Sequence, residues 1–216
     1  GGKGLFSKKI EIELLENKID LAVHALKDMP SIETEGLTTN CFLKRNFPNE
    51  ILISRNNVKF NELTSNSVVG TCSYRREYQL KQKRKDLIFK LVRGNVDTRI
   101  KKLNEGLYDA IILSKAGVDS LNLSNYITEE FSTEDIIPSV GQGVIAVQCR
   151  SNDIEMIEFL KKINHEETFN CVIAEREILK TLEGDCETAV GAISFLEGKK
   201  ITLVAELFSF DGKERY

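Results

Sequence analysis

VVGTCSYRRE, residues 68–77, is the stretch that decides the fold class. It opens with an apolar run typical of a buried strand, and Ser73 is a suitable N-cap for a helix that reaches about Arg84. LVRGNVDTRIKKL, residues 91–103, repeats this order, since a strand ends near its start and Asn95 can cap the following helix. Two consecutive strand–helix units predict right-handed crossovers and a mainly parallel sheet in the middle of the chain.

The rest of the chain alternates in the same way, because short Val- and Ile-rich runs end at polar or glycine-containing turns. The strands that we predict are 20–25, 37–43, 50–54, 67–71, 86–92, 108–114 and 143–149. The further helices are 8–17, 154–163 and 166–182, and a hairpin turns at 197–200. This order predicts an α/β protein with a separate C-terminal α+β unit from about His165.

Charge is distributed unevenly along the 216 residues, although the formal net charge is only -3. The segment 71–102 holds 11 Lys or Arg and 3 Asp or Glu, a local charge of +8. A nearly neutral chain argues against a dedicated nucleic-acid binder. No apolar run approaches the roughly 18 residues that span a bilayer, so we expect no membrane segment.

The cysteines are five in number and widely scattered, at positions 41, 72, 149, 171 and 186, with no CxxC pair. Neither a disulfide framework nor a zinc site is therefore expected, and we predict no metal site. A reducing compartment fits this pattern best.

An anion site is predicted where the strand of residues 67–71 meets its helix. Thr71 and Ser73 supply hydroxyls, and Arg75 and Arg76 supply guanidinium groups beside the free N–H groups of a helix N-terminus. The alternative interpretation is a capped helix with two exposed arginines.

The next strand–helix turn repeats the arrangement with Arg93, Gly94 and Arg99. Ligands bind at the carboxyl ends of parallel strands, where both turns lie. Two neighbouring turns with paired arginines favour a ligand that bears several carboxylates or phosphates.

Lys27 and Asp28 follow a buried strand and precede Pro30. An acid that leaves the core at this point can act as a general acid or base, or can stabilise a developing cation. A turn-forming Lys–Asp ion pair is the alternative. We expect His24 to be a core or satisfied polar residue.

GQGVIA, residues 141–146, superficially fits a dinucleotide-binding pattern, but Pro138 precedes it and a β-rich run follows it instead of a helix. Cys186 follows a predicted helix end at Gly184, which places it in a loop. A loop cysteine can be an attachment point or a nucleophile, whereas a free cysteine is most often a small buried hydrophobe.

Seven segments together resemble one family, porphobilinogen deaminase, also called hydroxymethylbilane synthase. They occur in family order as GGKGLF (1–6), VHALKDMP (23–30), VVGTCSYRRE (68–77), LVRGNVDTRIKKL (91–103), YDAIIL (108–113), VGQGVIAVQCR (140–150) and LEGDC (182–186).

The resemblance implies a three-domain α/β enzyme with two periplasmic-binding-protein-like domains and a small α+β third domain. The expected domains are 1–45 with 142–162, then 46–141, and then 163–216. The resemblance also implies that the N-terminal part of the first is missing and that the third ends early at Tyr216. The family is a transferase of tetrapyrrole and heme biosynthesis that condenses four porphobilinogen molecules into linear hydroxymethylbilane and releases ammonia. It uses a dipyrromethane cofactor held by a thioether, and the cysteine that matches is Cys186.

The family's catalytic aspartate matches Asp28, and its lid loop ends at positions that match Lys3 and Phe6. The positions that match cofactor-binding or substrate-binding residues are Lys27, Thr71, Ser73, Arg75, Arg76, Arg93, Gly94, Arg99 and Gln142. Porphobilinogen carries two carboxylates, so a surface rich in guanidinium groups suits a growing chain of pyrroles. Loss of ammonia leaves a cation, which a carboxylate at Asp28 would stabilise.

Two positions depart from the family. Ala25 stands where a hydroxyl is usual, and Ser120 stands where a further arginine is common. The resemblance also implies a monomer that acts on porphobilinogen and the growing oligopyrrole, without nucleic acid or membrane, in the cytoplasm or in a plastid. A non-catalytic two-domain binder of a polycarboxylate is the alternative, and it leaves Asp28 and Cys186 unexplained.

Overall fold

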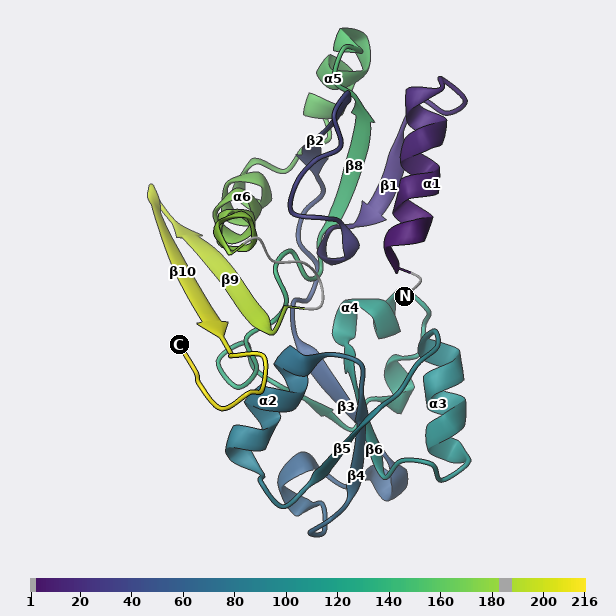
Figure 1. Cartoon of the computed structure of the whole chain (residues 1–216), viewed down its shortest axis with the longest axis vertical. Helices are drawn as coiled ribbons and strands as arrows, with labels where there is room; N and C mark the ends of the chain where they lie inside the picture. The colour runs from purple at the N-terminus through teal and green to yellow at the C-terminus, as the bar shows by residue number, and fades with distance from the viewer. Residues whose placement is uncertain (1–2, 183–187) are drawn as a thin grey trace. The chain divides into compact units, whose positions relative to one another are not determined.

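Strands and helices alternate along the chain in the computed structural model (Figure 1), which describes residues 3–182 and 188–216. The helices are α1 (Lys3–Leu15), α2 (Tyr74–Lys83), α3 (Val96–Asn104), α4 (Lys115–Asp119), α5 (Ile154–Lys161) and α6 (Glu166–Thr181). Short 3-10 helices are η1 (Leu26–Asp28), η2 (Arg55–Asn57), η3 (Phe60–Glu62) and η4 (Ser124–Tyr126). The strands are β1 (Ala22–Ala25), β2 (Leu37–Phe42), β3 (Glu50–Ser54), β4 (Val68–Thr71), β5 (Ile88–Leu91), β6 (Ala110–Ser114), β7 (Glu129–Glu130), β8 (Ile145–Arg150), β9 (Val190–Glu197) and β10 (Lys200–Leu207). The predicted α/β class is confirmed.

The described residues form two units. Unit 1 comprises residues 3–46, 139–182 and 192–204. Unit 2 comprises residues 47–138, 188–191 and 205–216. The chain therefore passes from unit 1 to unit 2 after residue 46 and returns after residue 138.

Unit 2 is built on a sheet with the strand order β5-β4-β6-β3-β7. β4 pairs in parallel with both β5 and β6, which confirms the parallel centre predicted from the two strand–helix units. β3 is antiparallel to β6 and to β7, so the sheet becomes mixed on that side. The two-residue strand β7 was not predicted, because so short a segment has no periodicity to read.

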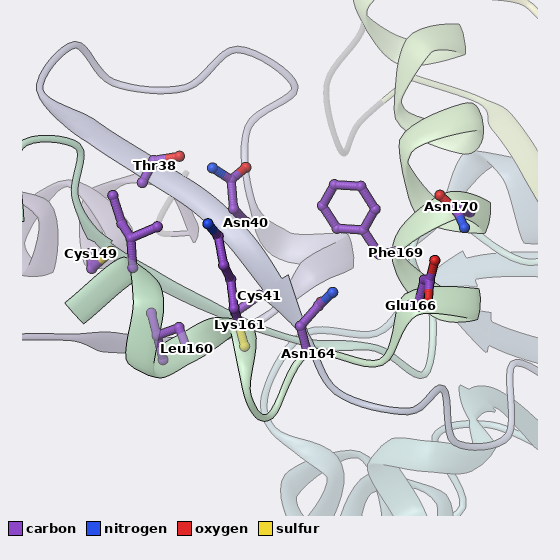
Figure 2. Close-up of a pocket in the computed structure, with 11 residues that line it drawn as sticks. Thr38, Asn40, Cys41, Cys149, Leu160, Lys161, Asn164, Glu166, Phe169 and Asn170 are labelled. Carbon is purple, nitrogen blue, oxygen red and sulfur yellow. The ribbon is translucent and has the colours of Figure 1, made fainter. Parts of the chain in front are cut away.

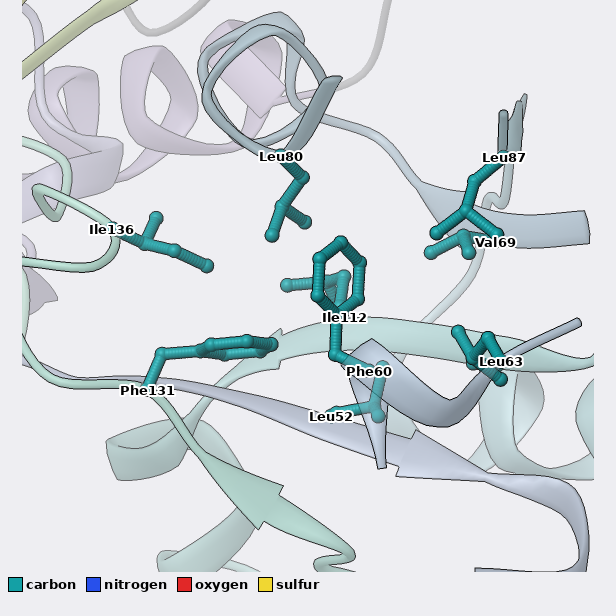
Figure 3. Packing of buried hydrophobic residues seen from close by; sticks show 10 residues of the cluster. Leu52, Phe60, Leu63, Val69, Leu80, Leu87, Ile112, Phe131 and Ile136 are labelled. Atoms are coloured by element: carbon teal, nitrogen blue, oxygen red, sulfur yellow. The ribbon is translucent and has the colours of Figure 1, made fainter. Parts of the chain in front are cut away.

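The two faces of this sheet carry two different cores. Strand alternation sends Leu52 and Ile112 to one face, where they pack with Leu80 of α2 (Figure 3). The intervening residues Ile51 and Ile111 point to the other face, where the core includes residues of α3. Because both faces are covered there, β6 and the part of β3 after Glu50 are largely apolar and buried, whereas the edge strand β5 is largely exposed.

The helices that follow β4 and β5 begin where the sequence predicts. The Ser73 hydroxyl caps α2 by accepting the Arg76 N–H at 3.5 Å, and the Asn95 side chain caps α3 by accepting the Thr98 N–H at 2.9 Å. Both predicted N-caps are confirmed. Because the helices start at these caps, their first N–H groups point toward the edge of the sheet at which β4 and β5 end.

Unit 1 contains a three-stranded antiparallel sheet in the order β1-β8-β2. Val147 and Cys149 of β8 pack with Leu160 of α5 on one face. Gln148, between them, faces the other way and donates to Glu11 of α1 at 3.1 Å. α5 and α1 therefore cover opposite faces of this sheet.

α1 is longer than predicted, since it begins at Lys3 rather than at residue 8. β9 and β10 form the predicted hairpin, and their sheet has two strands among the described residues. In residues 3–182 and 188–216, no helix combines the length and apolar character that crossing a bilayer needs.

Candidate functional site

The edge of the unit 2 sheet at which β4 and β5 end gathers the residues of the predicted anion site. β4 and β5 are neighbours in register, with Thr71 opposite Leu91, and the Val92 N–H donates to the Thr71 carbonyl at 3.2 Å. Thr71 is buried, and its hydroxyl accepts the N–H of Ser73 at 3.2 Å. The loop after β4 is therefore held in a shape that aims the first turn of α2 at this edge.

Arg75 and Arg76 are buried, with only 3% and 6% of their surface exposed. Arg75 Nη2 lies 2.5 Å from Glu50 Oε1, and Arg76 Nη2 lies 2.8 Å from Glu50 Oε2. The alternative of a capped helix with two exposed arginines is therefore wrong. The pair is a buried, partly neutralised cationic site.

Burial and charge both act on Arg75. Burial lowers its pKa from the ordinary value, the carboxylate of Glu50 opposes that shift, and the neighbouring charge of Arg76 adds to it. Two like charges side by side in a low-dielectric setting disfavour each other, and the shared carboxylate is what makes the pair tenable.

The turn after β5 presents the second predicted cluster. Arg93 is exposed, and Arg99 is half-buried with its Nε donating to the Gly94 carbonyl at 2.8 Å. Gly94 has a φ of +122°, and a Cβ at this position would lie 2.6 Å from Thr98 Cγ2. Glycine is required there by both the backbone and the close approach of the helix.

In unit 1, Lys27 and Asp28 form η1 directly after β1, with Lys27 half-buried and Asp28 exposed. The Leu26 N–H donates to the Val144 carbonyl at 2.9 Å, which ties η1 to the segment that precedes β8. Lys27 Nζ lies 3.5 Å from the side-chain oxygen of Gln142, a fully buried residue. The structure thus brings three predicted site residues of unit 1 together.

The GQG segment that fails as a dinucleotide motif has a structural role. Gly141 has a φ of +69°, and a Cβ there would lie 2.6 Å from Leu26 Cγ, so glycine allows η1 to approach the backbone. The Gly141 N–H donates to Glu175 Oε2 at 3.0 Å, and the Gln142 side chain also accepts from Ser139 at 3.2 Å. These contacts hold Gln142 in the orientation that meets Lys27.

The remaining positions predicted from the sequence lie outside these contacts or outside the described residues. The backbone places Lys3 and Phe6 in α1 rather than in a loop. Cys186 lies outside the described residues. Ser120 donates to the Gly117 carbonyl at 3.0 Å, and Ala25 is exposed at the end of β1.

His24 is the satisfied polar residue that the sequence predicts. Its Nε2 lies 3.2 Å from Gln148 Oε1, and Gln148 in turn donates to the buried carboxylate of Glu11. Among the described residues, no group of three or more His, Cys, Asp or Glu side chains is placed to hold a metal ion.

Sequence reasoning missed three charged residues that support the site, Glu50, Arg45 and Glu175. Glu50 opens an otherwise apolar strand, and Glu175 follows Val172 and precedes Leu179 on the buried face of α6. A charged residue at an apolar position needs a partner, and that conflict was the available signal.

A cavity of about 470 Å³ in unit 1 contains none of the predicted site residues (Figure 2). Cys41, Cys149 and Leu160 line it together with Phe169 and Asn170. None of its lining residues belongs to the predicted anion site of unit 2 or to the Lys27–Gln142 contact.

Two family models match the chain. Residues 1–158 match "Porphobilinogen deaminase, dipyromethane cofactor binding domain", and residues 169–216 match "Porphobilinogen deaminase, C-terminal domain".

Relatives named porphobilinogen deaminase are similar over essentially the whole chain. The protein from Geobacillus sp. (strain WCH70) is 44% identical over 100% of this chain and 70% of its own length. Those from Staphylococcus carnosus and Bacillus subtilis are 41% and 43% identical, over 100% and 99% of this chain and 71% and 68% of their own lengths.

Solved structures show more distant likenesses. The periplasmic VFT2 domain of Bordetella pertussis BvgS has a TM-score of 0.46 at 14% identity and covers 80% of this chain and 72% of its own. The sulfonate-binding protein SsuA from Methylobacillus flagellatus has a TM-score of 0.45 at 14% identity, over 79% of this chain and 52% of its own. These values are too low to carry an argument about function, whereas the family models and the relatives agree along the sequence. The chain belongs to the porphobilinogen deaminase family.

Proposed function

We propose that this chain performs the family's reaction, the condensation of four porphobilinogen molecules into hydroxymethylbilane with release of ammonia, and that Asp28 is its catalytic residue. Family membership makes the chain a transferase of tetrapyrrole biosynthesis with a dipyrromethane cofactor. Membership also disfavours the alternative of a non-catalytic polycarboxylate binder. The proposal concerns which residues bind the ligand and which one is catalytic.

The observation that carries the proposal is the buried arginine pair. Arg76 is 6% exposed, and its Nε has no hydrogen-bond partner among the described residues. A buried charged donor without a partner is costly, so a ligand group that accepts from it is favoured. Carboxylates are such acceptors, and dipyrromethane and porphobilinogen both carry them. The donor set therefore fits the cofactor that the family implies.

The two βα turns of unit 2 have complementary roles in this proposal. Arg75 and Arg76, with the Ser73 hydroxyl, bind carboxylates of the cofactor or of the incoming substrate at the end of β4. Arg93 and Arg99, beside Gly94, bind those of the incoming substrate or the growing chain. Arginine suits this task because its planar group stays charged and binds carboxylates through two parallel hydrogen bonds.

Asp28 and Lys27 have the chemical roles in unit 1. The cofactor, when bound, supplies a pyrrole whose free α-carbon is the nucleophile. Asp28 stabilises the positive charge that develops when ammonia leaves and can take up a proton from the coupled pyrrole. Lys27, held by Gln142, lies one residue away and binds a carboxylate. Lys3 and Phe6 are proposed to lie at the end of a lid.

Anchoring the primer at Cys186 keeps each intermediate on the protein between couplings, which raises the effective concentration of the reacting ends. Intact-mass spectrometry tests this anchor on protein purified from cells. We expect an adduct of two pyrrole units on the chain and its absence in Cys186→Ser. Cys72→Ser is the matched control and should keep the adduct. An active preparation with unmodified Cys186 would overturn the proposal.

We also propose three domains, residues 1–45 with 142–162, residues 46–141, and residues 163–216. The crossings between units after residues 46 and 138 support the first two, and the separate family model over residues 169–216 supports the third. Limited proteolysis followed by mass spectrometry tests these limits.

The oligomeric state and the cellular location are also part of the proposal. We propose a monomer that works in the cytoplasm, as bacterial relatives suggest, or in a plastid if the source bears one. Light scattering coupled to size-exclusion chromatography measures the first, and cell fractionation measures the second.

A further inference from the structure

Two buried arginines of unit 2 share a single buried carboxylate. Glu50, the first residue of β3, is fully buried and places one oxygen 2.5 Å from Arg75 Nη2 and the other 2.8 Å from Arg76 Nη2. Nothing in the strand pattern requires a charge at this position, because the next three residues of β3 are buried and apolar.

Each guanidinium is held at both of its ends. Arg75 Nη1 donates to the Ile137 carbonyl at 2.8 Å, and Arg76 Nη1 donates to the Ile112 carbonyl at 3.3 Å. Glu50 adds a hydrogen bond to Arg75 Nη2 and an ion-pair contact to Arg76 Nη2. A planar group fixed at two points has one orientation, which is the condition for binding a carboxylate with little loss of entropy.

None of these contacts involves the Nε of Arg76. Arg76 Nε is buried and has no hydrogen-bond partner among the described residues. Arg76 lies at the edge of the sheet where β4 ends, and its backbone N–H donates to the Ser73 hydroxyl. An anion that accepts from this nitrogen would satisfy the buried donor.

Charge leads to the same conclusion. Arg75, Arg76 and Glu50 sum to one net positive charge in a buried setting, which favours one anionic partner. The buried Glu206 also acts on Arg75, but it is itself paired with Arg215. Without Glu50, the two neighbouring cations would present a doubly positive site, and small inorganic anions would bind to it.

We propose that Glu50 is a positioning residue for carboxylate binding: it orients Arg75 and Arg76 and limits the charge they present, so that the pair accepts one carboxylate through Arg76 and excludes small anions. This inference rests on the proposed function for the identity of the carboxylate ligand. The role of Glu50 toward anions can be measured without it.

Thermal unfolding with sulfate as the probe tests the charge limit directly. We expect about 10 mM sulfate to raise the unfolding midpoint of Glu50→Gln by about 3 °C or more, and that of the unaltered chain by under about 1 °C. Glu77→Gln is the matched control, since Glu77 lies in α2 and pairs with Lys81 at the surface. A Glu50→Gln variant that is as indifferent to sulfate as Glu77→Gln would overturn the proposal.

Steady-state kinetics of the cofactor-loaded protein test the orientation. In Glu50→Gln, about 10 mM sulfate should raise KM for porphobilinogen about fivefold and leave kcat within about twofold, because the anion competes for the binding site. A loss confined to kcat would overturn this role. If neither turnover nor the adduct is found in the unaltered chain, the proposed function fails, while the sulfate shift still decides the role of Glu50.

A second variant covers the case in which Glu50→Gln does not fold. Glu50→Gln combined with Arg75→Gln replaces the ion pair by two amides and keeps the net charge at one. It should lose the sensitivity to sulfate, and its KM should be about fivefold or more above that of Arg75→Gln alone, because Arg76 has also lost its contact with Glu50. A KM equal to that of Arg75→Gln alone would overturn the orienting role.

Discussion

Arg45 Nη2 and Glu175 Oε1 lie 2.6 Å apart in unit 1, and Glu175 is fully buried. The same carboxylate accepts the Gly141 N–H at 3.0 Å and the Ser194 N–H at 2.8 Å. Arg45 lies just before the chain leaves unit 1, and Gly141 lies just after it returns. One glutamate of α6 therefore anchors the unit 1 ends of the crossings after residues 46 and 138.

Replacing that carboxylate should destabilise the chain strongly. Glu175→Gln leaves Arg45 without its counter-charge and places an amide among donors, so we expect the free energy of unfolding to fall by about 3–5 kcal/mol. Urea denaturation measures it. Glu177→Gln is the control, because its ion pair with Lys180 is about half exposed and should cost under about 1 kcal/mol. Equal losses in the two variants would contradict the anchoring role.

Asp28→Asn should separate folding from chemistry. Asp28 is exposed at the end of η1, so we expect an unchanged urea midpoint and an intact pyrrole adduct. Turnover should fall by about 10²-fold or more, because the amide neither carries the charge nor takes up the proton. Asp20→Asn, another exposed acid of unit 1, is the control and should turn over normally. Normal turnover in Asp28→Asn would remove its catalytic role.

Asp86 gives a pH dependence of stability with a definite sign. Hydrogen bonds from Arg84, and then from Ser65, hold the pKa of Asp86 well below its ordinary value of 3.8. A depressed pKa in the folded state stabilises it above the unfolded pKa, and this contribution is lost as pH falls toward the folded value.

We therefore expect Asp86→Asn to be less stable than the unaltered chain at neutral pH. The difference should shrink as pH falls below about 4, and about 1 M NaCl should reduce it because the pair is exposed. Urea midpoints measured across pH give the comparison. A gap that stays constant with pH would show that the ion pair is not its source.

The cysteines should differ in reactivity toward iodoacetamide. Burial raises the pKa of Cys41 and of Cys149, so fewer thiolates form there at a given pH, whereas Cys72 is half-buried in the turn after β4. At about pH 7.5 we expect Cys72 to be labelled before Cys41 and Cys149, and labelling of that buried pair to rise with pH.

Peptide mass spectrometry resolves the sites one by one. In about 6 M urea the burial is lost, and the same residues should react at similar rates, which controls for differences in peptide recovery. Equal rates in the folded chain would contradict the buried positions of Cys41 and Cys149.

Local patterns predicted most of the elements because they are written in neighbouring residues. The apolar run before Gly70 and the caps at Ser73 and Asn95 are short-range features, and both caps form as expected. The start of α1 was predicted late, since the residues before position 8 have little apolar periodicity. The strand β7 has no sequence signature and exists because it pairs with β3.

By itself the sequence determined the α/β class, the position of the basic turns and the family, since all three depend on residue types in a fixed order. Only the tertiary structure decided that Arg75 and Arg76 are buried and that Glu50, far from them in the chain, balances them. The pairing of Arg45 with Glu175 was equally hidden. A charge is tolerated in a protein interior only when folding brings a partner to it, and no local pattern records which distant residue that partner is.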